Sequence, residues 1–213
     1  MLNLLITALG QTLLMVISSA LIASFFGLIL GVTLHITRKG QIMAHPKIHS
    51  LLGTIVNIGR SVPFIILLVA TIPVTRFLVG TSIGTLAAIV PLSIGAIPFM
   101  ARLIEAALVE IPTGLLDAAN SMGCHPLQII TKVLLPEALP GILNSITITM
   151  VTLVDYSAMA GAIGGGGLGD IGIRYGYQRF DLKIMLITIL LLVALVQIIQ
   201  NGGHYFCKKV DHR

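Results

Sequence analysis

The chain has 213 residues, of which 56% are hydrophobic and only 10% are charged. A soluble domain carries roughly 25% charged residues. So few charges cannot cover a surface that faces water, and the composition therefore indicates a membrane protein with several spans. The net charge of +5 does not indicate nucleic-acid binding. The Lys and Arg residues lie in short loops between apolar runs and form no single basic patch.

Five apolar runs are long enough to cross a bilayer, which takes about 20 residues. The sequence therefore predicts an all-α membrane protein with a single transmembrane domain, residues 1–213. The predicted spans are approximately 13–35, 51–77, 83–108, 139–160 and 184–206, with a polar loop at 109–136 between spans three and four. The first run is too long for a cleaved signal peptide, so we expect it to be retained, with a lead-in at the membrane interface.

Small residues and prolines predict local features of the first two spans. Gly27 and Gly31 are four residues apart, a spacing that lets two helices approach closely. Pro63 and Pro73 are expected to bend the second span, since neighbouring groups in a bundle can satisfy the carbonyls that proline leaves free.

Two pairs of ionisable residues in or near the spans bear on packing and function. Arg102 and Glu105 are three residues apart on one helix face and are placed to pair. Arg60 and Asp155 lie inside spans two and four, where such residues usually face a cavity or a partner. Counting residues from the inner face places them at depths that differ by roughly 10 Å, so we expect no direct pairing.

No catalytic, metal or cofactor site is predicted. His45 and His49 are four apart, but no carboxylate or cysteine lies nearby to complete a metal site. Cys124 and Cys207 lack metal-site spacing. The segment Gly164–Gly169, "GGGGLG", lacks the Lys-Ser/Thr ending of a phosphate-binding loop and is read as flexible backbone at the outer mouth.

The distribution of basic residues predicts the orientation. Lys and Arg favour the cytoplasmic side, which suggests that the N-terminus is outside and the C-terminus is cytoplasmic. The residues placed inside by this topology are Arg38, Lys39, Lys47, Arg102, Lys132, Lys208, Lys209 and Arg213, and those placed outside are Arg76, Arg174, Arg179 and Lys183.

The polar loop reads as two short helices joined by a sharp turn. Pro112 fits the first turn of the first helix, and its apolar face is predicted to comprise Leu115, Ala118, Ala119 and Met122. Gly123 is placed to end this helix in the left-handed conformation. The polar face lacks the Lys and Arg of a membrane-surface helix, so a protein partner is the better explanation for the apolar stripe.

Prolines delimit the second short helix. His125 precedes Pro126 and is expected to be non-helical, while Pro126 opens a helix that runs to about Leu135. Lys132 lies in its last turn, where the helix dipole favours a cation. Pro136 is expected to break this helix where the fourth span begins.

This loop resembles the coupling loop of permease subunits of bacterial ABC importers, written Glu-Ala-Ala, three residues, Gly, nine residues, Ile-x-Leu-Pro. The matching positions are Asp117, Ala118, Ala119, Gly123, Val133, Leu135 and Pro136. Asp replaces Glu and Val replaces Ile, and both changes are conservative. In that family the loop docks into a cleft of a cytoplasmic ATPase.

Further stretches, among them "GRSVPFIILL" and "YSAMAGAIGGGGLGDIGIRYGYQRF", resemble the permease subunits of methionine importers over nearly the whole chain. The resemblance implies a homodimer in the bacterial inner membrane, two separate ATPase subunits and an external substrate-binding lipoprotein. It also implies a path for D- or L-methionine between two copies. The candidate path residues are Arg60, Ser61, Pro63, Asp155, Tyr156 and Met159. The family generally has a small residue at position 155, so the resemblance does not account for this aspartate.

The nearest alternative is the same kind of permease with another cargo, such as a dipeptide or a quaternary amine. A channel or ion-coupled carrier fits less well, because only Arg60 and Asp155 are available as filter or relay groups. An intramembrane enzyme fits least, since the spans contain no catalytic constellation.

Overall fold

The computed structural model describes residues 2–210 of the chain and is almost entirely helical in that range. Arg213, which entered the charge comparison, lies outside the described residues. The helices and π-helical turns are α1 (Leu2–Thr37), α2 (Pro46–Ser61), α3 (Phe64–Ala70), α4 (Ile72–Val79), α5 (Thr85–Val109), α6 (Thr113–Ser121), α7 (Pro126–Ile129), η1 (Ile130–Leu134), α8 (Leu135–Glu137), α9 (Leu139–Ala160), η2 (Gly161–Gly165), α10 (Gly167–Ile171), η3 (Gly172–Tyr177) and α11 (Leu182–Val210).

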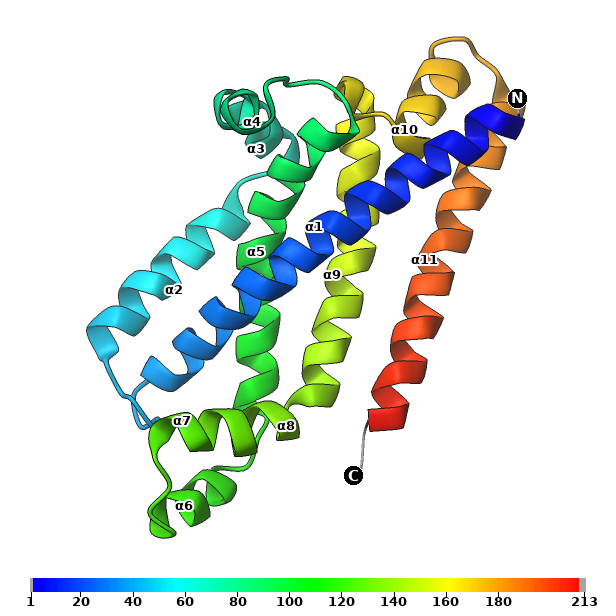
Figure 1. Ribbon diagram of the computed structural model, residues 1–213. Coiled ribbons are helices and arrows are strands. Elements are labelled where there is room, and N and C mark those ends of the chain that lie inside the picture. Colours follow the sequence, from blue (N-terminus) through cyan, green and yellow to red (C-terminus); the bar gives the residue numbers. More distant parts are fainter. Residues whose placement is uncertain (1, 211–213) are drawn as a thin grey trace.

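Four of these helices are long and apolar enough to cross a membrane: α1, α5, α9 and α11. The bent pair formed by α2 and α3 makes a fifth when it is counted as one span. The structure therefore agrees with a five-span membrane protein, with the polar loop between α5 and α9 (Figure 1).

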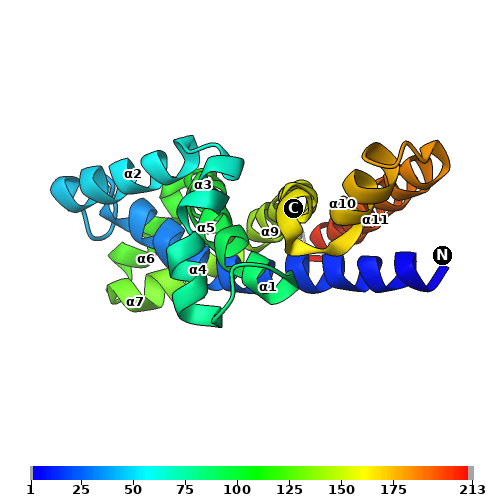
Figure 2. The ribbon, with the colours of Figure 1, turned by 90° about the horizontal axis from the view of Figure 1, so that it is seen from above.

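Helix α1 is longer than predicted. The sequence analysis placed a span within 13–35 after an interfacial lead-in, whereas the structure has one continuous helix of 36 residues. No proline interrupts this stretch. A helix of that length spans about 54 Å, well beyond a hydrocarbon core of roughly 30 Å. Consistent with this excess, α1 runs obliquely across α5 and α9 (Figure 1), and from above its N-terminal half runs along one side of α9, α10 and α11 (Figure 2).

The second predicted span is broken rather than merely bent. Its residues form α2, α3 and α4, and α2 and α3 meet at 100°. The cause is Pro63, because the residue before a proline is pushed out of the helical region. Val62 accordingly has extended angles, φ −77 and ψ 123. Pro73 lies in the first turn of α4, where its missing N–H costs nothing.

The two glycines of α1 do allow close approach, as predicted. An added Cβ on Gly27 would lie 2.6 Å from Cγ of Met100, and one on Gly31 would lie 2.7 Å from the carbonyl oxygen of Ala101. Both partners belong to α5, and α1 with α5 is the most extensive helix pair of the described chain. These glycines therefore set the distance between the two helices.

Two side chains of α1 bind the start of α10. The backbone N–H of Gly167 donates to Oε1 of Gln11 at 2.8 Å, and that of Leu168 donates to Oγ1 of Thr12 at 2.9 Å. These bonds satisfy two of the free N–H groups at the start of α10. The glycine-rich segment is thus held to the first helix at this point.

The two ends of the bundle carry the segments that the charge pattern assigned to opposite sides. The beginning of α2, the helices α6 to α8 and the C-terminal end of α11 lie toward one end, whereas the N-terminus, α4 and α10 lie toward the other (Figure 1). We call the first the loop end and the second the outer end.

The contact at Gly31 predicts that a large residue destabilises the protein there but not at a glycine of α1 that makes no contact. Leucine at position 31 would collide with the backbone of α5, and overpacking of this kind costs about 1–3 kcal/mol. Gly31→Leu should therefore lower the thermal unfolding midpoint of the purified protein in detergent. Gly10→Leu is the control, because nothing lies within 4 Å of a Cβ at that position. Equal midpoints for the two variants would contradict this account of the contact.

Candidate functional site: the polar loop and the polar faces of the spans

The first short helix of the loop, α6, exposes most of the predicted apolar face and buries a second apolar face that was not predicted. Leu116 and Ala119 are buried, whereas Leu115 is 41% exposed and Met122 is 76% exposed. Ala118 is exposed as well. The predicted apolar face is therefore wrong for Ala119. The helix is apolar on two sides, one packed on the bundle and the other bare.

The helix starts and stops close to where the sequence predicted. Pro112 is the N-cap residue, one position before the expected first turn. Gly123 has φ +76, and its N–H donates to the carbonyl of Asn120 at 2.9 Å. Nothing lies within 4 Å of a Cβ at position 123, so the backbone angle alone favours glycine here.

The second half of the loop departs from the prediction at Pro136. His125 is extended and Pro126 opens α7, as expected. However, Pro136 does not end the helix, because the chain stays helical to Glu137 and turns at Ala138. The reason is the π-helical turn η1 just before it, in which the N–H of Leu135 donates to the carbonyl of Ile130. A π turn shifts the backbone hydrogen bonds by one residue just before Pro136, so the helix accommodates the proline ring and its missing N–H.

The buried side of the loop is continuous with the end of α5. Leu116 and Ala119 of α6, with Ile129 and Leu134 of the second half, belong to one apolar cluster. The same cluster contains Met100, Ile104, Leu108 and Ile111. Val133 and Leu135 pack at its margin, whereas Asp117 is exposed. The loop is thus anchored on α5 through its interior face.

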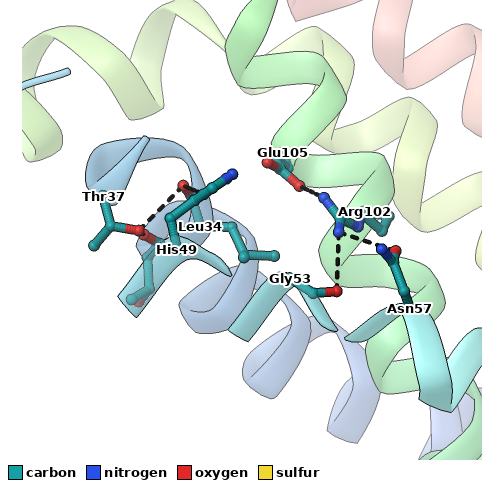
Figure 3. Close-up of polar contacts among 8 residues, drawn as sticks. Leu34, Thr37, His49, Gly53, Asn57, Arg102 and Glu105 are labelled. Carbon is teal, nitrogen blue, oxygen red and sulfur yellow. Dashed lines mark hydrogen bonds and ion pairs between the residues drawn. The ribbon is translucent and has the colours of Figure 1, made fainter. Parts of the chain in front are cut away.

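A polar network ties α5 to α2 close to this cluster (Figure 3). Arg102 forms the predicted ion pair with Glu105, at 2.5 Å. Its Nη2 also donates to the carbonyl of Gly53 at 3.1 Å and to Oδ1 of Asn57 at 2.9 Å. The bonds to α2 were not predicted, because Gly53 and Asn57 carry no charge and lie far from Arg102 in the sequence.

The candidate path residues at the bend of α2 lie close together. Arg60 and Tyr156 line one cavity of about 210 Å³ together with Phe99. The guanidinium carbon of Arg60 lies 6.0 Å from the centre of the Phe99 ring. Tyr156 stacks on Phe64, the first residue of α3, with ring centres 4.2 Å apart.

Ser61 and Pro63 form the bend itself. The Ser61 hydroxyl donates to the carbonyl of Asn57 at 2.8 Å, and Pro63 is the N-cap of α3. Both are exposed. Their role in a path remains a prediction.

Arg60 and Asp155 form no ion pair among the described residues, in agreement with the expectation that the two do not pair directly. Arg60 shares a cavity with Tyr156, the neighbour of Asp155 in the chain. Asp155 and Met159 are exposed on another face of α9 and do not line this cavity.

The sequence analysis missed a groove between α9 and α11 that is lined by both polar and apolar residues. It has a volume of about 660 Å³. Its lining residues are Pro140, Gly141, Asn144, Thr147, Ile148, Val151, Thr152, Gln200, His204 and Cys207. The signal was present in the sequence, as polar residues three or four apart in two apolar runs. Such a pattern shows which face is polar but not that the two faces meet.

Comparison with known families decides the class of protein. Residues 27–206 match the model of the binding-protein-dependent transport system inner membrane component. The chain belongs to this family.

Curated relatives in the family are close. The chain is 61% identical over 211 residues to the probable D-methionine transport system permease protein of Vibrio cholerae, covering 99% of this chain and 94% of that protein. It is 56% identical over 161 residues to the D-methionine transport system permease protein of Escherichia coli K12, covering 76% and 74%.

Solved structures agree with the family assignment. The chain superposes with a TM-score of 0.98 on a chain of the inward-facing MetNI methionine ABC transporter, at 53% identity and covering 100% of this chain and 98% of that one. An amino acid ABC transporter crystallised with histidines gives a TM-score of 0.80 at 18% identity over 97% and 94% of the two chains, a likeness of fold.

The Arg102 network predicts how this family member responds to loss of the cation. Arg102→Met keeps the apolar stem but leaves the buried Glu105 carboxylate without its partner, at a cost of roughly 1–3 kcal/mol. The thermal unfolding midpoint should fall, and it should recover in part in Arg102→Met/Glu105→Gln, which removes the unpaired carboxylate. Lys132→Met, an exposed position, is the control. A double variant no more stable than the single one would contradict the pairing.

Proposed function

We propose that this chain is the permease subunit of an ATP-driven ABC importer and forms the membrane path for methionine. The observation that carries the proposal is the match over the whole chain to a subunit of a methionine ABC transporter, together with the curated D-methionine permeases. The chain itself performs no covalent chemistry, and ATP hydrolysis belongs to a separate subunit.

The proposed assembly contains two copies of this chain, two ATPase subunits at the loop end and an external substrate-binding lipoprotein at the outer end. The contact with the ATPase is made by the bare face of α6. Leu115, Ala118 and Met122 are exposed there, and an apolar stripe of this kind is suited to burial in a protein cleft. Asp117 adds a negative charge to this contact, and Gly123 ends the helix beside it.

Coupling follows from the way in which the loop is anchored. A displacement of α6 by the ATPase is passed to α5 through the buried cluster around Leu116 and Leu134. It reaches α2 through Arg102. The end of α2 carries Arg60 and Ser61, two of the candidate path residues, so the motion of the loop arrives at the path.

The proposed orientation places the N-terminus outside and the C-terminus in the cytoplasm. Lys47, Lys132 and Lys208 lie in segments grouped toward the loop end, and Arg76 and Arg174 lie in segments grouped toward the outer end (Figure 1). The excess of basic residues at the loop end supports its placement on the cytoplasmic side.

The function is tested by reconstituting the permease with its ATPase in vesicles and adding the binding protein. ATP-dependent uptake of labelled D- or L-methionine is expected. A complex that takes up a dipeptide or a quaternary amine, and no methionine, would refute the proposed cargo but retain the importer. Uptake that persists without ATP would refute the importer.

In the same vesicles, Gly123→Val should lower uptake and weaken retention of the ATPase in pull-down. A non-glycine residue at positive φ costs about 1 kcal/mol or more, and here the strain tilts α6 at its contact face. Gly40→Val is a matched control. Gly40 also has positive φ and open space around it, but it lies in the other loop at that end. Equal losses in both variants would contradict a specific role for the Gly123 turn.

The orientation predicts the accessibility of Cys124, which follows α6 and is partly exposed. An impermeant thiol reagent should not label Cys124 in intact cells and should label it once the membrane is opened. A Cys124→Ser variant identifies the labelled site. Labelling of Cys124 in sealed cells would reverse the proposed topology.

A further inference from the structure

Asp155 is a carboxylate that the described chain leaves without a partner. It lies in α9, within a segment apolar enough to span a membrane, and it is exposed. Among residues 2–210 it has no hydrogen bond or ion pair. A charged side chain facing lipid in the middle of a span costs at least about 2.5 kcal/mol. The carboxylate must therefore face water, a ligand or another chain.

Helical spacing places Asp155 one turn beyond the last α9 residues that line the groove between α9 and α11. Residues three and four positions apart share a helix face, so Asp155 follows Val151 and Thr152, both of which line the groove. The groove starts near Pro140 and Cys207 at the loop end.

Asp155 and its neighbour Met159 place a negative group and an apolar surface side by side. Met159 lies one turn further along α9 and is 45% exposed, so it offers an apolar, polarisable surface next to the carboxylate. Arg60, whose guanidinium lies over Phe99, lines a cavity with Tyr156 on another face of α9 and forms no ion pair among the described residues. The carboxylate of Asp155 and the thioether of Met159 therefore share one exposed face of α9, and the guanidinium lies at a different face.

From this arrangement, and resting on the proposed function, we infer that Asp155 is a specificity residue that binds the α-ammonium group of the substrate during transit. An ammonium group donates charge-assisted hydrogen bonds to a carboxylate, and such bonds are the stronger ones. The carboxylate favours primary amines and disfavours anions that lack the ammonium group.

The inference is tested by direct binding to the permease–ATPase complex in lipid nanodiscs. The binding protein is left out, so that only the permease discriminates between the probes. Three probes are compared: methionine, 3-(methylthio)propylamine, which keeps the ammonium group, and 4-(methylthio)butanoate, which lacks it. The wild type should bind the first two and reject the third.

Asp155→Asn keeps the shape but removes the charge. It should weaken binding of methionine and of the amine about 10- to 100-fold and leave binding of the butanoate unchanged or tighter. Asp155→Glu should restore preference for the amine. Asp181→Asn is the matched control, because Asp181 accepts N–H groups at the start of α11, away from the groove, and asparagine can accept the same bonds.

Two results would overturn the inference while the proposed function stands. One is that Asp155→Asn binds methionine as tightly as the wild type does, or that the substitution changes the affinities for methionine and for the butanoate by the same factor. The other is dissociation of the two permease copies in Asp155→Asn, seen by size-exclusion chromatography, which would make Asp155 a contact between subunits. A wild-type complex that binds none of the probes would overturn both the inference and the proposed cargo.

Discussion

The close contact between α1 and α5 is the constraint on which the remaining structure depends. Water supplies no driving force between helices inside a bilayer, so association there rests on tight packing and on hydrogen bonds. Gly27 and Gly31 supply the packing by letting α1 lie directly on the backbone of α5. Helix α5 also contacts α2, α3, α4 and α9. The position of α5 therefore sets the positions of the loop, the bend and the path.

The same helix joins the two functional regions. At the loop end, α5 ends in the apolar cluster that holds Leu116 and Leu134. About two turns before the end of α5, Arg102 reaches across to α2. A packed interior transmits displacement because its side chains cannot be compressed, and hydrogen bonds to a backbone carbonyl fix direction as well as distance. The loop, α5 and α2 thus form one mechanical unit.

The features predicted correctly depend on residues near one another in the sequence. The turn at Gly123 and the pair of Arg102 with Glu105 follow from spacing along one helix. The features that were missed depend on tertiary contacts. The sequence could not show which apolar side of α6 would pack inward, or that Asn144 and Gln200 face one groove. The break at Pro63 was underestimated, because a proline in a span gives a kink or a full break according to what its neighbours satisfy.

The two membrane charges treated most differently by the fold are Arg102 and Asp155. Arg102 is surrounded by acceptors, since Glu105, Gly53 and Asn57 use three of its hydrogen bonds. A charge satisfied in this way stabilises one arrangement of helices. Asp155 has no side-chain partner within the described chain and lies one helical turn beyond Val151 and Thr152, which line the groove between α9 and α11. An unpaired carboxylate in a span has an energetic cost. Because the fold gives Arg102 its partners and gives Asp155 none, Asp155 remains available to bind a transient ligand.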